Sequence, residues 1–119
     1  MTSIPDWIGK LTALEVLDVS QNALTNVDVG INKCVNLKTF SAEFNSLAVF
    51  VFQPASLTKL EKIYLRSNDL TTLPTWITGF GNRTSMEFSG NALCNLDPSV
   101  SAWINANNRV KLERQICGP

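Results

Sequence analysis

An asparagine recurs every 23 residues along most of this 119-residue chain, and this period constrains the fold more than any other feature. Each asparagine is followed two positions later by a leucine, and several other apolar positions keep the same register. A fixed period of 20–50 residues is typical of architectures in which identical structural units stack on one another. The asparagines are Asn22, Asn45, Asn68 and Asn91, and the leucines are Leu24, Leu47, Leu70 and Leu93.

The pattern within one period is L-x-x-L-x-L-x-x-N-x-L, and its clearest copy covers residues 60–74. Arg83 and Pro54 interrupt two of the apolar ladders. The pattern resembles the leucine-rich-repeat family over residues 1 to about 103. This resemblance implies an α/β solenoid that forms a short arc, with parallel strands on the concave face. Its convex face would carry irregular segments, 3₁₀ turns and short helices.

Alternation within the clearest copy predicts a short strand in which Ile63 and Leu65 face the core and Tyr64 faces outward. The resemblance implies that the asparagines are structural. In such folds the Asn side chain lies inside a turn and bonds the backbone, because it carries both donors and an acceptor. We therefore expect the four-membered asparagine ladder to hold the fold together and to take no part in chemistry.

On the convex side, Pro5 and Pro74 each open a segment that predicts a short helix or 3₁₀ turn, because proline suits the first helical position. The corresponding segments at 28–33 and 51–56 lack this proline, and we expect irregular turns there. Two tryptophans follow the two prolines. Trp7 and Trp76 are expected to cover the convex core, and the alternative is an exposed aromatic pair for a partner.

The C-terminal part of the chain is expected to close the solenoid. Residues 1–102 are predicted to be leucine-rich repeats, with a partial first repeat at 1–10 and about four copies after it. Residues 103–119 are predicted to be a C-terminal cap. Asp97 and Pro98 indicate the start of a helix that extends to about residue 106. Beyond it, residues 107–119 are expected to leave the repeat pattern, as the end of a solenoid requires.

Three cysteines allow at most one internal disulfide. The chain's ending resembles the C-terminal cap of secreted or surface leucine-rich-repeat proteins of bacteria, which implies that a Cys94–Cys117 disulfide pins the cap. The alternative is two unpaired thiols in a cytoplasmic protein. Cys34 occupies an apolar ladder position and is expected to be a buried, unreactive thiol. We therefore expect a secreted or cell-surface protein, with a cytoplasmic one as the alternative.

At the other end the chain starts in the middle of a repeat, so the strand expected at 16–20 would be an open sheet edge. Two explanations compete. Either further repeats precede Met1 in a longer protein, or this edge is buried in a homo-oligomer.

The outward positions of the predicted strands form the candidate binding surface, which is the usual binding surface of the family. Strand formation places no demand on these side chains. Four strands at roughly 4.8 Å spacing and about 15 Å length give a face of about 300 Å², whereas a specific protein interface needs roughly 800 Å² per partner. The face therefore suits a peptide, a glycan or part of a larger composite surface. Its candidate residues are Asp18, Ser20, Ser41, Glu43, Phe44, Lys62, Tyr64, Arg66 and Glu87.

Composition narrows the function classes. Ten basic and ten acidic residues give a net charge of zero, which offers no general attraction for nucleic acid. The chain has no histidine, the commonest general base and metal ligand, and it shows no cofactor motif or membrane-spanning run. We therefore expect no enzymatic activity, metal, cofactor, nucleic acid or membrane insertion. The first hypothesis is a recognition module for a protein, peptide or glycan, and the alternatives are an assembly module or a cytoplasmic scaffold.

Overall fold

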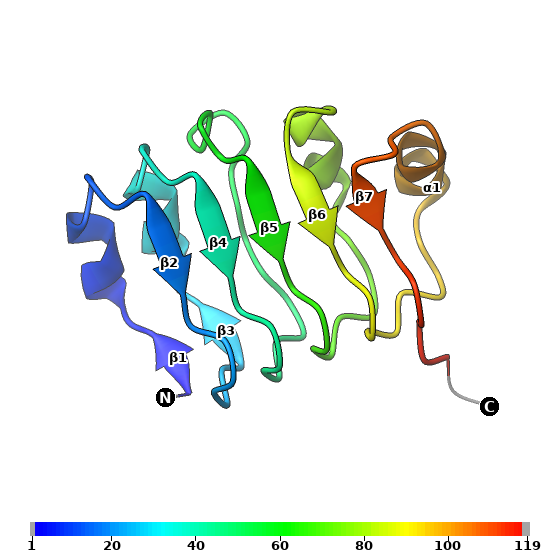
Figure 1. Cartoon of the computed structure of the whole chain (residues 1–119), viewed down its shortest axis with the longest axis horizontal. Helices are drawn as coiled ribbons and strands as arrows, with labels where there is room; N and C mark the ends of the chain where they lie inside the picture. The colour runs from blue at the N-terminus through cyan, green and yellow to red at the C-terminus, as the bar shows by residue number, and fades with distance from the viewer. Residues whose placement is uncertain (1, 118–119) are drawn as a thin grey trace.

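The computed structural model describes residues 2–117, which form successive coils of a solenoid measuring 41 × 28 × 17 Å. In each coil a short strand is followed by a turn and by a segment that returns on the opposite side (Figure 1). The strands stack into one parallel sheet in the order β2-β4-β5-β6-β7. Their bounds are β2 Val16–Asp18, β4 Thr39–Ser41, β5 Lys62–Tyr64, β6 Ser85–Glu87 and β7 Val110–Lys111.

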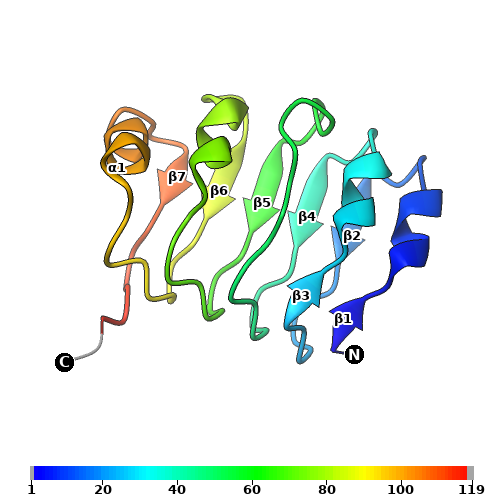
Figure 2. The same ribbon diagram turned by 180° about the vertical axis from the view of Figure 1, so that it is seen from behind.

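Two smaller elements pair away from this sheet. Strand β1 (Ser3–Ile4) pairs in parallel with β3 (Asn26–Val27), with Ile4 and Val27 buried in the core. The opposite side of the solenoid, here called the helical side, carries four helical elements within the described residues (Figure 2). These are the 3₁₀ helices η1 (Asp6–Lys10), η2 (Val29–Lys33) and η3 (Thr75–Phe80) and the α-helix α1 (Pro98–Asn105).

The sheet register follows the sequence period. Leu17, Phe40, Ile63 and Met86 are consecutive partners across the sheet, and the last three are buried. In β5 and just after it, Ile63 and Leu65 are fully buried while Tyr64 is half-buried on the outward face. The predicted alternation is therefore confirmed.

The asparagine ladder ties each coil to the next, as predicted. The Nδ2 of Asn68 donates to the carbonyl of Leu65 in its own coil at 3.2 Å and to that of Ala42 in the preceding coil at 2.9 Å. Its Oδ1 accepts from the backbone amide of Leu47 at 3.0 Å. One amide side chain thus satisfies backbone groups of two coils that water cannot reach. The same pattern of bonds recurs at Asn45 and Asn91.

The 3₁₀ helices after Pro5 and Pro74 are confirmed, since each proline is the N-cap of η1 or η3. The expectation of an irregular turn at 28–33 is wrong, because η2 forms there. Asp28 takes the place of the proline as N-cap, and its carboxylate accepts from the amide of Gly30 at 2.8 Å. An acidic side chain at the N-cap accepts a hydrogen bond from a backbone N–H that has no partner within the helix.

Residues 51–56 form turns, as predicted, and large aromatic rings fill the space of the absent helix. Phe52 is 1% exposed and packs edge-on against Phe40 and Phe50. Trp76 contacts Phe50 at 5.3 Å between ring centroids, so it covers the core as predicted. The same prediction is wrong for Trp7, which is 51% exposed, because its side chain has no such aromatic cluster beneath it.

Arg83 interrupts one of the apolar ladders, and the residue after it, Thr84, is buried in its place. Thr84 is fully buried, and its hydroxyl donates to the carbonyl of Leu60 at 2.8 Å. Arg83 itself is exposed, lies over the ring of Phe80 and donates to the carbonyl of Pro54. The two exceptions to the sequence pattern thus meet on the helical side.

The C-terminal region follows the prediction in its helix and in its disulfide. Helix α1 begins after Asp97, whose carboxylate accepts from the amide of Ser99 at 2.9 Å. Cys94 and Cys117 are disulfide-bonded, with their Cα atoms 5.9 Å apart. The predicted boundary between residues 102 and 103 falls inside α1.

Residues 107–117 leave the 23-residue register, as expected, yet they continue the solenoid, and residues 118–119 lie outside the described part of the chain. Strand β7 pairs in parallel with β6, so the cap adds a fifth strand to the sheet. Gln115 then takes the role of the ladder asparagine. Its Nε2 donates to the carbonyls of Phe88 and Leu112, and its Oε1 accepts from the amide of Leu93. This last coil is one residue longer than the others, and the extra residue lies before β7, so Gln115 follows β7 at the same position at which Asn91 follows β6.

Candidate binding face

The outward face of the five-stranded sheet, here called the strand face, carries the predicted site residues. Its central column consists of residues that are consecutive partners in the sheet register. The column passes from an acidic end through an aromatic ring to a second acid and a base. Its members are Asp18, Ser41, Tyr64, Glu87 and Lys111.

At the N-terminal end of the strand face, polar side chains bond one another. Asp18 accepts from the amide of Ser20 at 3.0 Å, and the hydrogen bonds from the Ser20 backbone and hydroxyl hold the pKa of Asp18 below its usual value. The hydroxyls of Ser20 and Ser41 share a hydrogen bond of 2.9 Å. Ser41 is only 9% exposed, which leaves little of its side chain for a ligand to contact. The small side chain lies below the level of its neighbours.

The next part of the face contains the predicted pair of opposite charges. Arg66 on the coil of β5 lies 3.3 Å from the carboxylate of Glu43 on the coil before it. The Glu43 side chain is 18% exposed and that of Arg66 is 52% exposed, so the guanidinium stays available at the surface. Exposed pairs of this kind contribute at most about 1 kcal/mol to stability. Lys62 is exposed on the same strand as Tyr64.

Two hollows open on the C-terminal half of the strand face, and both are lined by Glu87. One has a volume of about 300 Å³ and lies beside Tyr64 and Lys111. The other has a volume of about 400 Å³ and lies beside Phe44 and Arg66. Oε1 of Glu87 accepts from the amide and the hydroxyl of Ser89, so its carboxylate is fixed between the two hollows. The strand face is therefore hollowed where aromatic and charged side chains meet.

Phe44 occupies a backbone position that the sequence analysis treated as unconstrained. One residue per coil, just after the strand, has a left-handed backbone with φ between 58° and 73°. This conformation costs roughly 1–2 kcal/mol for a residue other than glycine. The expectation that strand-face positions place no demand on their side chains is therefore wrong for the positions with this left-handed backbone. The column consists of Gln21, Phe44, Ser67, Gly90 and Arg114.

Sequence reasoning missed the residues that the last coil adds to the hollows, namely Arg109, Lys111 and Arg114. They were missed because the period lengthens by one residue there, which moves every later position out of the 23-residue register. A search for the ladder amide as either Asn or Gln would have found Gln115 and hence the fifth strand.

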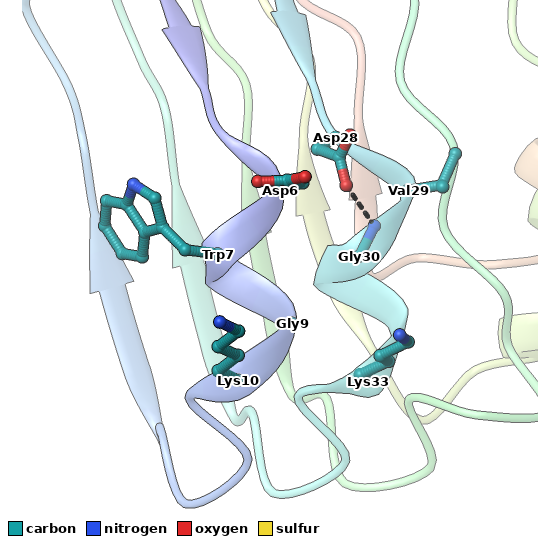
Figure 3. A pocket seen from close by; sticks show the side chains of 8 residues that line it. All are labelled: Asp6, Trp7, Gly9, Lys10, Asp28, Val29, Gly30 and Lys33. Carbon is teal, nitrogen blue, oxygen red and sulfur yellow. Dashed lines mark hydrogen bonds between the residues drawn. The ribbon is translucent and has the colours of Figure 1, made fainter.

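The helical side also has a hollow, of about 390 Å³, between η1 and η2. Gly9 and Gly30 let the two helices approach, since a Cβ on Gly30 would lie 3.3 Å from the carbonyl oxygen of Asp6. Trp7 and Val29 both line this hollow, and Figure 3 shows their side chains pointing away from each other. The acidic and basic side chains lie at opposite ends of the helices and do not converge on a common point. We therefore place the candidate site on the strand face.

Comparison with known proteins agrees with this geometry. The Leucine Rich Repeat family model matches residues 59–80, the coil that contains β5 and η3. The solved structure of a leucine-rich-repeat protein of Leptospira interrogans matches with a TM-score of 0.79 at 25% sequence identity and covers 97% of this chain. This chain contains a leucine-rich repeat and has the leucine-rich-repeat fold. Curated protein sequences give no match.

This leucine-rich-repeat chain spans 29% of the length of the Leptospira protein's chain. Leucine-rich repeats are in general non-enzymatic modules for protein interaction. Within residues 2–117, no helix is long and apolar enough to span a membrane. In the same part of the chain, no group of three or more His, Cys, Asp and Glu side chains is placed to hold a metal ion.

Proposed function

We propose that this leucine-rich-repeat chain is a recognition module that binds a protein segment, a peptide or a glycan on its strand face, the concave side of the arc in this family. The observation that carries the proposal is the pair of hollows that meet at Glu87. Binding sites are concave surfaces with a few converging polar groups, and the strand face offers both.

The composition around the hollows supports the same proposal. Tyr64 is half-buried, Phe44 is 52% exposed, and Arg66 lies at the rim with 52% of its side chain exposed. Tyrosine and arginine are enriched among the residues that dominate binding energy at interfaces. Five strands give the face a projected area of about 360 Å², which suits a peptide or an oligosaccharide better than a whole globular surface.

The double variant Tyr64→Ala/Arg66→Ala tests this proposal. A partner identified by pull-down or by peptide and glycan arrays should bind it about tenfold more weakly or worse, because both side chains contact the ligand. The melting temperature should change little, since the Arg66–Glu43 pair is exposed and Tyr64 lies outside the core. Calorimetry of binding and thermal unfolding by circular dichroism measure the two effects.

The matched control is Val29→Ala/Lys33→Ala, which removes an exposed apolar side chain and a cation from the helical side. It should bind like the wild type. If an identified partner binds the strand-face variant as tightly as the control variant, the proposed function is wrong.

A second candidate function is assembly of the chain into a homo-oligomer through the edge of β2. Apolar side chains gather at that end of the solenoid, where Val16 is 60% exposed and Trp7 and Leu11 are also exposed. Burial of such a patch is a common reason for association.

We further propose that the protein is secreted or lies on the cell surface, and the Cys94–Cys117 disulfide supports an oxidising compartment. A cytoplasmic scaffold is the alternative. Thiol titration of the denatured, unreduced protein from its native host separates the two. One free thiol, that of Cys34, is expected for an exported protein, whereas three free thiols would contradict export.

A further inference from the structure

Three cations near the end of the sheet have no anionic partner in the fold. Within residues 2–117, no carboxylate lies within 4.0 Å of the charged nitrogens of Arg109, Lys111 or Arg114. All three side chains are exposed. The guanidinium of Arg109 is oriented by a neutral group, since Nη2 and Nε donate to the hydroxyl of Ser85 at 2.8 and 3.1 Å. Arg109 is therefore positioned but not neutralised, and Lys111 and Arg114 form no ion pair within the same residues, although Glu113 lines the same hollow as Arg114.

The cations are divided between the two hollows of the strand face. Arg109 and Lys111 line the hollow beside Tyr64, whereas Arg114 lines the hollow beside Phe44. Arg109 and Arg114 are five residues apart in the chain, so their Cα atoms are at most about 18 Å apart. A ligand that neutralises both groups of cations must carry two separate negative charges within this distance of each other.

Glu87 lies between the two hollows and restricts what the middle of the ligand can carry. Its Oε1 is engaged by Ser89, and within the described residues its Oε2 accepts no hydrogen bond. A negative charge in the middle of the ligand would be repelled, whereas a backbone N–H could donate to Oε2. A continuous polyanion therefore fits this arrangement poorly, and an extended peptide fits it well.

We infer that the C-terminal half of the strand face binds an extended peptide with two acidic side chains four residues apart and neutral residues between them. This inference rests on the proposed function and names the ligand of the same site. Residues four apart in an extended chain are about 13 Å apart and lie on the same side, so both carboxylates can face the protein.

The test uses fluorescently labelled synthetic peptides and the full chain with its disulfide intact. The probe is Ac-GDTVTDFG-NH2, in which the two acids are four residues apart. Its controls are GNTVTNFG, which has no charge, GTDVDTFG, in which the acids are two apart, and GDTDTDFG, which has a third acid in the middle. We expect the probe to bind at least about tenfold more tightly than each control, with affinity falling as salt screens the charges.

Protein variants assign the effect to the named cations. Lys111→Gln and Arg114→Gln should each weaken binding of the probe by about threefold, and the double variant by about tenfold. The matched control Lys10→Gln removes an exposed cation from the helical side and should leave binding unchanged. Glu87→Gln should selectively improve binding of the peptide with the middle acid, because it removes the repulsion.

The outcomes distinguish this inference from the proposed function. If the probe binds no better than the uncharged peptide at concentrations up to about 1 mM, or if Lys111→Gln/Arg114→Gln binds it like Lys10→Gln, the inference is overturned. The proposed function still stands in that case if an identified partner loses affinity in Tyr64→Ala/Arg66→Ala. If that partner keeps its affinity, the proposed function fails independently of the acidic peptide.

Discussion

The ladder asparagines show how one residue type carries different energetic weight at equivalent positions. Asn91 is 1% exposed and bonds backbone groups of two coils, whereas Asn22 is exposed and its Nδ2 donates only to carbonyls of its own coil. Water can replace the bonds of an exposed amide but not those of a buried one. The contribution of the ladder to stability should therefore increase from the first coil to the last.

Asn91→Ala is expected to lower the free energy of unfolding by about 2–4 kcal/mol, because it leaves the Leu70 amide and the Leu65 carbonyl buried without partners. Asn22→Ala should cost less than about 1 kcal/mol. Urea unfolding followed by circular dichroism measures both. Equal losses for the two variants would show that burial does not set the weight of the ladder.

Phe44 shows a compromise between stability and binding. Its left-handed backbone costs roughly 1–2 kcal/mol relative to a glycine, the residue found at the same position of the next coil but one. Because the Phe44 ring is 52% exposed, packing in the core does little to offset this backbone cost. A role at the rim of the second hollow accounts for a phenylalanine there.

At the scale of elements, the last coil combines two functions. Strand β7 closes the sheet and brings Arg109 and Lys111 to the strand face, while Gln115 completes the ladder. The disulfide holds the segment after β7 against the preceding coil, since Cys117 is bonded to Cys94. The cap and the C-terminal half of the candidate site are therefore one structural unit.

Reduction of the Cys94–Cys117 disulfide should lower the free energy of unfolding by about 3 kcal/mol, because it frees a loop with a sequence separation of 23 residues. Urea unfolding with and without a phosphine reductant measures this loss.

Cys34→Ala is the control for this experiment. Cys34 is buried, and burial raises the pKa of its thiol, so it is not expected to contribute to the redox response. The response should be the same in Cys34→Ala and should disappear in Cys94→Ser/Cys117→Ser. A redox response that survives in the double serine variant would contradict this assignment.

At the scale of the whole molecule, the two ends of the solenoid differ in chemistry. The coil that ends at β7 carries α1 on the helical side and is pinned by the disulfide, whereas Val16, Leu11 and Trp7 are exposed at the end next to β2. The net charge of zero provides no general repulsion between copies. Association through the β2 end is therefore the quaternary arrangement to test.

If the β2 edge mediates a homo-oligomer, size-exclusion chromatography with light scattering should show a dimer whose fraction rises with concentration. Val16→Glu should abolish it by placing a charge in the apolar patch, while Val51→Glu on another part of the surface should not. A clean monomer of the wild type at high concentration would refute assembly through this edge.

The sequence by itself determined the features that repeat locally. The 23-residue period predicts the strand positions, the asparagine ladder and the buried thiol of Cys34, and each is confirmed. Resemblance to the family's C-terminal cap predicts the disulfide as well. These predictions succeed because one coil's pattern of apolar and amide side chains already specifies how it stacks on an identical neighbour.

Only the tertiary structure decided the features that depend on how unlike coils meet. Asp28 replaces a proline as a helix cap, Thr84 replaces the ladder residue at Arg83, and Gln115 replaces an asparagine in a coil one residue longer. Each substitution satisfies the same packing or hydrogen-bonding demand with a different side chain, so a fixed period does not reveal it. The cations of the last coil, and with them the shape and charge of the candidate site, follow from the placement of β7 on the sheet.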